Sequence, residues 1–170
     1  MAGKLFKHLK KRPIKLALEI GLILLVFTGI KTWQERNMIS GTPPALHAQL
    51  LTGEAFKLES LQGKPVLLHF WASWCKICRL EQGSIENISK DHTVISIAMK
   101  SGDANDISQY MTKHQLSFPV IIDASGDISH RYGVYAVPAN FILDPAGKII
   151  FKSSGFSTEW GLRLRLWLAD

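Results

Sequence analysis

The stretch "HFWASWCKICR", His69 to Arg79, contains the only two cysteines of the chain, Cys75 and Cys78. Two thiols separated by two residues can bind a metal ion, close a small structural disulfide or exchange electrons as a dithiol–disulfide couple. The flanking residues help to decide among these. "KPVLLHFW" (64–71) is a nearly continuous apolar run, typical of a strand buried on both faces. "KICRLEQGSIENIS" (76–89) has the apolar spacing of a helix.

The first cysteine is therefore predicted to lie where a buried strand ends and a helix begins. The helix N-terminus offers free backbone N–H groups and the positive end of the helix dipole, and both favour a thiolate over a thiol at Cys75. Lys76 adds a positive charge beside it. Cys78 follows one helical turn later, where it can attack a mixed disulfide formed on Cys75. The spacing favours a nucleophile and a resolving thiol.

The other chemistries of a cysteine pair fit the sequence less well. A structural zinc site needs about four ligands, and the chain has no second cysteine pair. Its six histidines show no metal-binding spacing: His8, His47, His69, His92, His114 and His130. A structural disulfide across two residues would close a tiny loop and add little stability. A Cu(I) site that uses both thiols with Met99 or His69 stays open as the alternative function, that of a copper-binding or copper-tolerance module.

The charge of the chain is concentrated at its N-terminus. The formal net charge is +6, and residues 1–36 carry all of it, with eight Lys/Arg against two acids. Residues 37–170 hold 12 basic and 12 acidic residues. The predicted folded part thus has no charge excess for binding DNA or RNA, and we expect no nucleic-acid partner.

A basic head, residues 1–13, precedes an apolar segment, residues 14–33, that is long enough to span a bilayer. Trp33 suits an interfacial anchor, and the positive-inside rule places the head in the cytoplasm. A cleaved signal peptide is the competing interpretation, but no A-x-A-like site follows Val26. A buried amphipathic helix fits poorly because apolar residues surround the whole segment. We therefore expect an uncleaved signal anchor and, at residues 34–44, a linker.

Residues 45–170 are predicted to form one α/β domain with a mixed central sheet flanked by helices. The domain begins with two short strands around a turn at residues 52–54. Strands and helices then alternate, and a hairpin turns at "DPAG", residues 144–147. The closing helix, "STEWGLRLRLWLAD", is predicted to begin at Ser157 or Thr158. We expect it to turn Leu162, Leu166 and Trp167 inward and Arg163 and Arg165 outward.

"KPVLLHFWASWCKIC" resembles the active-site segment of thioredoxin-fold proteins, and "YGVYAVPANFILDPAGKIIFKSSG" resembles the second signature of that fold. Residues 45–170 resemble the membrane-anchored TlpA/ResA-like family as a whole, and most closely its suppressor-of-copper-sensitivity protein D type. The resemblance implies a thioredoxin-like fold with an N-terminal hairpin, preceded by one transmembrane helix. It also implies a protein-disulfide oxidoreductase that needs no cofactor beyond the redox-active Cys75–Cys78 disulfide.

The resemblance assigns roles to further residues. Pro138 is the proline that follows a cis peptide bond and faces the cysteines, and Val137 offers its backbone to a substrate peptide. Trp74 flanks the disulfide. His69 stands where thioredoxins have a buried Asp that helps to move the proton of the resolving thiol. It is either a proton relay or a core histidine with one hydrogen bond.

Two departures from the family pattern leave questions open. Counting back from "SFP" places Asp103 where ResA-like reductases bring a carboxylate near the cysteines, although Asp103 is an equally good N-cap for the next helix. The dipeptide between the cysteines, Lys76-Ile77, matches neither thioredoxin nor DsbA, so it does not set the direction of electron flow. A peroxidase of the peroxiredoxin kind lacks support because the P-x-x-x-T/S-x-x-C segment is missing before Cys75.

The partners and location follow from the same resemblance. We expect a single-pass protein of the bacterial inner membrane with its C-terminal domain in the periplasm, acting on periplasmic protein thiols and disulfides. The reducing direction is favoured because TlpA/ResA-like relatives usually reduce. A membrane electron donor of the DsbD type would then recharge the cysteines.

Overall fold

The computed structural model of the chain describes the backbone of residues 3–170 and the side chains of residues 15–26 and 28–170. The chain divides into two compact units, residues 1–36 and residues 37–170. Each unit is described by itself. Of the predicted basic head, residues 1–2 and all the side chains lie outside the described part.

The first unit is one helix, α1 (Gly3–Glu35). Within it, Lys15–Glu35 is a candidate span of 21 residues, and its most apolar 18 residues have a mean hydropathy of 1.7. By length and composition this stretch is able to cross a membrane. It overlaps the predicted span at residues 14–33 and extends two residues further.

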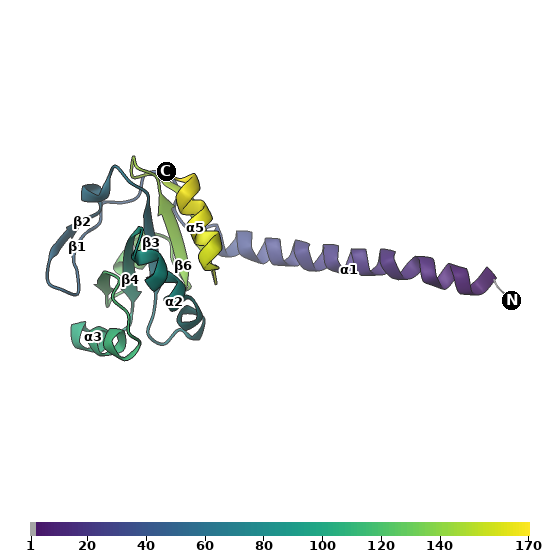
Figure 1. The fold of residues 1–170 in the computed structure, drawn as a ribbon, viewed down its shortest axis with the longest axis horizontal. Helices are drawn as coiled ribbons and strands as arrows, with labels where there is room; N and C mark the ends of the chain where they lie inside the picture. The colour runs from purple at the N-terminus through teal and green to yellow at the C-terminus, as the bar shows by residue number, and fades with distance from the viewer. Residues whose placement is uncertain (1–2) are drawn as a thin grey trace. The chain divides into compact units, whose positions relative to one another are not determined.

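The second unit is built on a five-stranded mixed sheet (Figure 1) in the order β5-β4-β3-β6-β7. The central strand, β3, runs parallel to β4 and antiparallel to β6. β5 is parallel to β4, and β7 is antiparallel to β6. The bounds of the strands are β3 (Val66–Trp71), β4 (Thr93–Met99), β5 (Val120–Asp123), β6 (Ala139–Leu143) and β7 (Ile149–Ser154). This is the thioredoxin-like fold that the sequence predicted.

Helices cover both faces of the sheet. One face packs against α2 (Lys76–Ser89), α3 (Ala104–Lys113) and α5 (Glu159–Leu168), whose buried residues join one apolar cluster with Leu67 and Trp71 of β3. The other face carries a second cluster with Leu68 and Phe70, covered by α4 (Asp127–Arg131) and by the N-terminal segment. β3 is buried along its whole length because it contributes side chains to both clusters.

The N-terminal segment borders both edges of the sheet. A small hairpin, β1 (His47–Gln49) and β2 (Ala55–Lys57), precedes the short 3-10 helix η1 (Leu58–Leu61). At its tip Leu50 forms an antiparallel bridge with Ile121 of β5. Gly41 pairs in the same way with Ile149 of β7, donating over 3.3 Å and accepting over 2.8 Å.

The structure differs from the sequence analysis at the start of the domain. The predicted linker, residues 34–44, was to precede a domain that begins at Ala45. The compact unit instead begins at Asn37. Met38 is buried, and its carbonyl oxygen accepts a hydrogen bond from Lys152 Nζ at 2.6 Å. These residues belong to the domain because their backbone is paired with it.

One prediction about α5 is wrong. Trp167 was expected to point inward, but 71% of its surface is exposed. The buried residues of α5 and its end are Leu162, Leu166 and Ala169, which repeat at helical spacing. Trp167 follows Leu166 by one residue, a rotation of about 100° around the helix, and so leaves the buried stripe. Thr158 is the N-cap, as one of the two predicted residues.

Candidate active site

The two cysteines lie at the junction of β3 and α2, as predicted. β3 ends at Trp71, and a turn closed by the Cys75 N–H and the Ala72 carbonyl leads into α2. Cys75 is the N-cap of α2, and its Sγ accepts a hydrogen bond of 3.1 Å from the backbone N–H of Cys78. The two sulfurs are joined in a disulfide. A donor aimed at the Cys75 sulfur stabilises a thiolate there once the disulfide is reduced.

The two sulfurs differ in their access to solvent. Cys75 retains 7% of its surface exposed, whereas Cys78 has none. An incoming sulfur can therefore reach Cys75 more readily than Cys78. This difference gives the pair the arrangement of an attacking thiol and a resolving thiol.

The loop before β6 faces the disulfide. The peptide bond between Val137 and Pro138 is cis, as the resemblance implied. The carbonyl oxygen of Val137 lies 3.5 Å from Cys75 Sγ. The pairing of Phe70 with Ala139 in the sheet explains this proximity, because it sets the beginning of β6 beside the end of β3.

Trp74 and Lys76 are exposed on either side of Cys75. The Trp74 indole N–H donates to the carbonyl oxygen of Lys100 at 3.0 Å, which fixes the ring beside the disulfide while 57% of the residue stays exposed. Ile77 and Tyr135 are also more than half exposed. Exposed apolar side chains thus stand next to Cys75 in the sequence, at Trp74 and Ile77, and two residues before Val137, at Tyr135.

A buried polar chain lies beneath the site, between the sheet and the helices. His69 and Asn140 are direct partners across β3 and β6, and His69 Nδ1 lies 2.8 Å from Asn140 Oδ1. The Asn140 amide donates to Glu81 Oε1 at 2.8 Å. All three residues are buried. Since the amide oxygen accepts, Nδ1 of His69 is assigned the proton, and the bonds all point toward the carboxylate.

Burial shifts the pKa values of His69 and Glu81 in opposite directions. It lowers the pKa of His69 to about 4, and the hydrogen bond with Asn140 offsets this only in part. Burial raises the pKa of Glu81 to about 7, against the opposing hydrogen bonds from Asn140 and Ser157. His69 is thus neutral near pH 7, and Glu81 is the member that exchanges a proton there. His69 Nε2 and Glu81 Oε2 have no hydrogen-bond partner among the described residues.

Glu81 and Asn140 were missed by the sequence analysis. Glu81 follows Cys78 by three residues, so both side chains lie on the inward face of α2. Its spacing with Ile85 and Ile88 was a usable signal, because a carboxylate on a buried stripe is uncommon. Asn140 gave no comparable signal, since its pairing with His69 depends on the register of two strands that are distant in sequence.

Asp103 caps α3. Its carboxylate accepts hydrogen bonds from the backbone N–H groups of Asn105 and Asp106, at 2.9 and 3.0 Å. Asp106 returns a bond to the Asp103 N–H, which completes a capping box. Of the two roles that the sequence left open, the structure shows the N-cap; the role near the cysteines stays a prediction.

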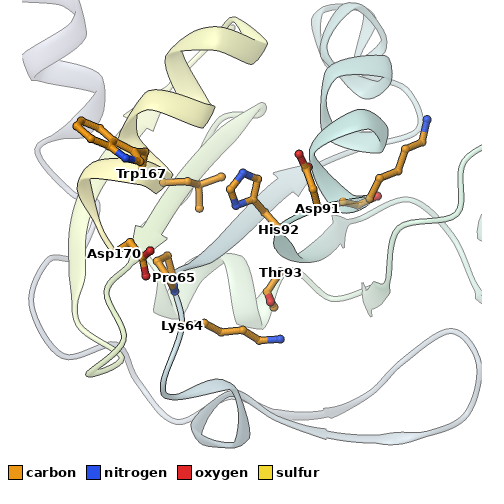
Figure 2. Close-up of a pocket in the computed structure, with 10 residues that line it drawn as sticks. Lys64, Pro65, Asp91, His92, Thr93, Trp167 and Asp170 are labelled. Atoms are coloured by element: carbon orange, nitrogen blue, oxygen red, sulfur yellow. The ribbon is translucent and has the colours of Figure 1, made fainter.

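One hollow of the domain is remote from the disulfide. It measures about 480 Å³ and lies where β3 and β4 begin and α2 and α5 end, at the opposite end of the strands from the cysteines (Figure 2). Among the described residues, no three His, Cys, Asp or Glu side chains are grouped so as to hold a metal ion.

The fold and the paired cysteines define a thioredoxin-like redox protein. Residues 41–152 match the model of the AhpC/TSA family, and the chain belongs to that family. A thioredoxin-like protein of Haemophilus influenzae is 32% identical over 162 residues, which cover 94% of this chain and 96% of the relative.

Two further likenesses specify the chemistry. A thiol-disulfide oxidoreductase ResA of Bacillus thuringiensis is 29% identical, covering 79% of this chain and 80% of its own. The crystal structure of a secreted Mycobacterium tuberculosis disulfide oxidoreductase, homologous to DsbE, is 28% identical with a TM-score of 0.64. It covers 72% of this chain and 95% of its own. The protein is a thiol-disulfide oxidoreductase of the ResA/DsbE type with a Cys75–Cys78 pair.

Proposed function

We propose that this chain is a membrane-anchored reductase of protein disulfides outside the cytoplasm. The observation that carries the proposal is the asymmetry of the cysteine pair. Cys75 caps a helix N-terminus and keeps an exposed edge, whereas Cys78 is closed off behind it. Such a pair accepts a substrate on one sulfur and releases it with the other.

The reaction begins with both cysteines reduced. The Cys75 thiolate attacks one sulfur of a substrate disulfide, a mixed disulfide forms, and the other substrate sulfur leaves as a thiolate that takes up a proton. The Cys78 thiolate then attacks the Cys75 sulfur. The Cys75–Cys78 disulfide closes, and the second substrate sulfur leaves. Two electrons have passed from the chain to the substrate, which ends as a dithiol.

Cys78 must lose its proton before it attacks, and Glu81 is the proposed acceptor. The carboxylate lies one helical turn after Cys78 on the same buried face, and its pKa of about 7 suits proton exchange near neutrality. Asn140 holds the carboxylate, and His69 in turn holds Asn140. His69 is thus proposed as a positioning residue, and its low pKa disfavours the relay role.

The substrate is proposed to lie across Trp74 and the Val137–Pro138 loop. Its backbone would pair with that of Val137 in the manner of an added strand, while apolar side chains contact Trp74, Ile77 and Tyr135. The exposure of these three residues supports this placement. Lys76 is proposed to favour the thiolate of Cys75 by its charge.

The anchor is proposed to be the apolar part of α1, with the basic head in the cytoplasm and residues 37–170 in the periplasm of a bacterium. Its length, its hydropathy and the positive residues before it support this topology. The secreted mycobacterial relative is consistent with an extracytoplasmic domain. Electrons would then reach the cysteines from a membrane donor of the DsbD type.

The reduction potential of the Cys75–Cys78 pair tests the direction. The fragment 37–170 would be equilibrated in glutathione or dithiothreitol buffers, and the reduced fraction measured by thiol labelling. We expect a value near or below that of thioredoxin, roughly −270 mV. A value near that of DsbA, roughly −120 mV, would show an oxidant instead. A pair that does not close to a disulfide would favour the copper alternative.

A further inference from the structure

The loop that follows β4 holds the turn that leads into Cys75. β3 and β4 are parallel neighbours, so their carboxyl ends lie at the same edge of the sheet. The Trp74 indole N–H donates to the carbonyl oxygen of Lys100 at 3.0 Å. The backbone N–H of Ser73 donates to the hydroxyl oxygen of Ser101, also at 3.0 Å. Two adjacent residues of one loop are thus hydrogen-bonded to two adjacent residues of the active-site turn.

Lys100 has an unusual backbone conformation. In the part of the chain that the structure describes, two residues other than glycine have a positive φ, Lys100 at 46° and Gln115 at 55°. A residue with a Cβ meets steric resistance in this left-handed region and stays there only where its surroundings determine the conformation. Both backbone groups of Lys100 are engaged, since its N–H donates to the Asp123 carbonyl at 2.9 Å and its carbonyl accepts from Trp74. The left-handed conformation therefore connects the end of the pairing with β5 to the contact with the indole.

The hydrogen bond restrains a large side chain at the active site. Trp74 is more than half exposed, so packing alone restrains its ring little. A side chain that is free to change rotamer loses this freedom when a partner binds, and the loss weakens binding. A ring that is already held loses less. Because the substrate is proposed to lie across Trp74, the orientation of the ring bears on how tightly a protein substrate is bound.

We propose that Lys100 is a positioning residue for the reaction, whose left-handed backbone holds Trp74 in the orientation that receives a protein substrate. Lys100 acts through its carbonyl oxygen, and its exposed ammonium group takes no part in this contact. The inference rests on the proposed placement of the substrate and goes beyond it, since that placement leaves open what orients the ring.

Two substitutions of Lys100 separate the backbone from the charge. Lys100→Gly and Lys100→Val both remove the ammonium group. Glycine adopts a positive φ without steric cost, whereas a β-branched residue is strongly disfavoured there. Gln115→Val is the matched control, because it imposes the same conflict at the other left-handed residue, whose N–H donates to the Thr112 carbonyl.

The indole N–H of Trp74 reports the orientation of the ring. The full oxidised chain, with isotope-labelled tryptophan and in detergent micelles, would be studied by NMR, and Trp74→Phe would identify the signal of Trp74. We expect Lys100→Val to shift this signal and to speed the exchange of its proton with water about tenfold, because a hydrogen-bonded N–H exchanges only when it opens. Lys100→Gly and Gln115→Val should keep both properties close to those of the wild type. The signal of the buried Trp71 shows whether each variant is folded.

Kinetics connect the orientation of the ring with the reaction. The measured quantity is the rate constant of the reduced chain with insulin, divided by that with oxidised glutathione, a small disulfide that offers little apolar surface. We expect Lys100→Val and Trp74→Ala each to lower this ratio about fivefold, and the double variant to lower it no further, because both changes remove the same contact. Lys100→Gly is expected to restore most of the ratio lost in Lys100→Val.

The other outcomes separate this inference from the proposed placement of the substrate. An unchanged Trp74 signal in Lys100→Val overturns the inference, as does a ratio that falls in Trp74→Ala but not in Lys100→Val, and the placement then still stands. Losses that multiply in the double variant also overturn it, because Lys100 would then act by a route other than Trp74. An unchanged ratio in Trp74→Ala refutes the placement itself, and the inference with it.

Discussion

Cys75 and Cys78 share a disulfide, but their different surroundings give the two sulfurs different roles in the reaction. The edge of Cys75 that remains exposed is the only part of the pair that a large substrate can approach, because Cys78 is fully buried. The backbone N–H of Cys78 donates to the Cys75 sulfur and stabilises negative charge on it once the disulfide is reduced. The roles of nucleophile and resolving thiol follow from these two contacts.

Removing the resolving thiol should therefore trap the substrate. In Cys78→Ala we expect Cys75 to attack a substrate disulfide and to remain joined to it, because no second thiol can release it. The adduct would be seen as a higher band on a non-reducing gel and identified by mass. Cys75→Ala is the matched control and should form little adduct. Equal trapping by both variants would contradict the assignment.

The shifted pKa values of Glu81 and His69 determine how each residue contributes to the pH dependence of the stability. The pKa of Glu81 is raised from 4.5 to about 7, so between these values the folded chain holds a proton that the unfolded chain has lost, and stability falls as the pH rises. The pKa of His69 is lowered from 6.5 to about 4, so in that window the unfolded chain holds the extra proton, and stability rises with pH. The two contributions largely cancel between about pH 4.5 and 6.5.

Glu81→Gln should remove the contribution of Glu81 to the pH dependence of stability and leave that of His69. Across the same window, its free energy of unfolding should rise more steeply with pH than that of the wild type, by about 1.4 kcal/mol per pH unit. Urea unfolding of the oxidised fragment 37–170 at several pH values measures the slope. His69→Asn should change the slope in the opposite sense. Parallel curves for all three proteins would show that these groups do not titrate as described.

At the scale of elements, the sequence was most informative where periodicity was strong. α2 begins and ends at the predicted residues because Cys75 caps it and its apolar residues repeat at helical spacing. α5 was predicted as a helix, but the orientation of Trp167 was wrong. From the sequence, Trp167 resembles a core residue because it is large, apolar and next to a buried position. The burial of Leu166 shows which side of the helix faces the domain, and Trp167 lies outside that side.

The cap at α3 separates two roles of Asp103. Asp103→Ala should lower the free energy of unfolding by about 1 kcal/mol, because two backbone N–H groups lose their acceptor. As an N-cap alone, Asp103 should leave the reduction potential of the cysteines unchanged. Thr158→Ala removes the cap of α5 and serves as the matched control. A shift in potential in Asp103→Ala but not in Thr158→Ala would support the role near the cysteines that the family resemblance suggested.

At the scale of the whole molecule, the position of the domain boundary was beyond the reach of sequence patterns. Residues 39–44 contain the Ser, Gly and Pro of an ordinary tether, and nothing local indicates that Gly41 pairs with Ile149, more than one hundred residues away. The buried chain of His69, Asn140 and Glu81 escaped prediction for the same reason. Its members come from three elements that only the complete fold brings together.

Two fragments test the boundary. The fragment 45–170 should be less stable than 37–170 by about 2 kcal/mol or more, since it loses the buried side chain of Met38. It also loses the bridge between Gly41 and Ile149. Urea unfolding of both fragments gives the comparison. Equal midpoints and slopes would show that residues 37–44 are the passive linker predicted from the sequence.

The bridges at the two outer strands also bear on how copies of the protein behave when crowded. The rim of a sheet presents unpaired N–H and C=O groups on which another chain can add its own strand, a common route to aggregation. In this domain Leu50 and Leu51 engage β5 on one side, and Gly41 engages β7 on the other. The stretch from Gly41 to Leu51 thus shields both rims where it touches them. Copies of the protein can therefore collide often without joining their sheets at these places.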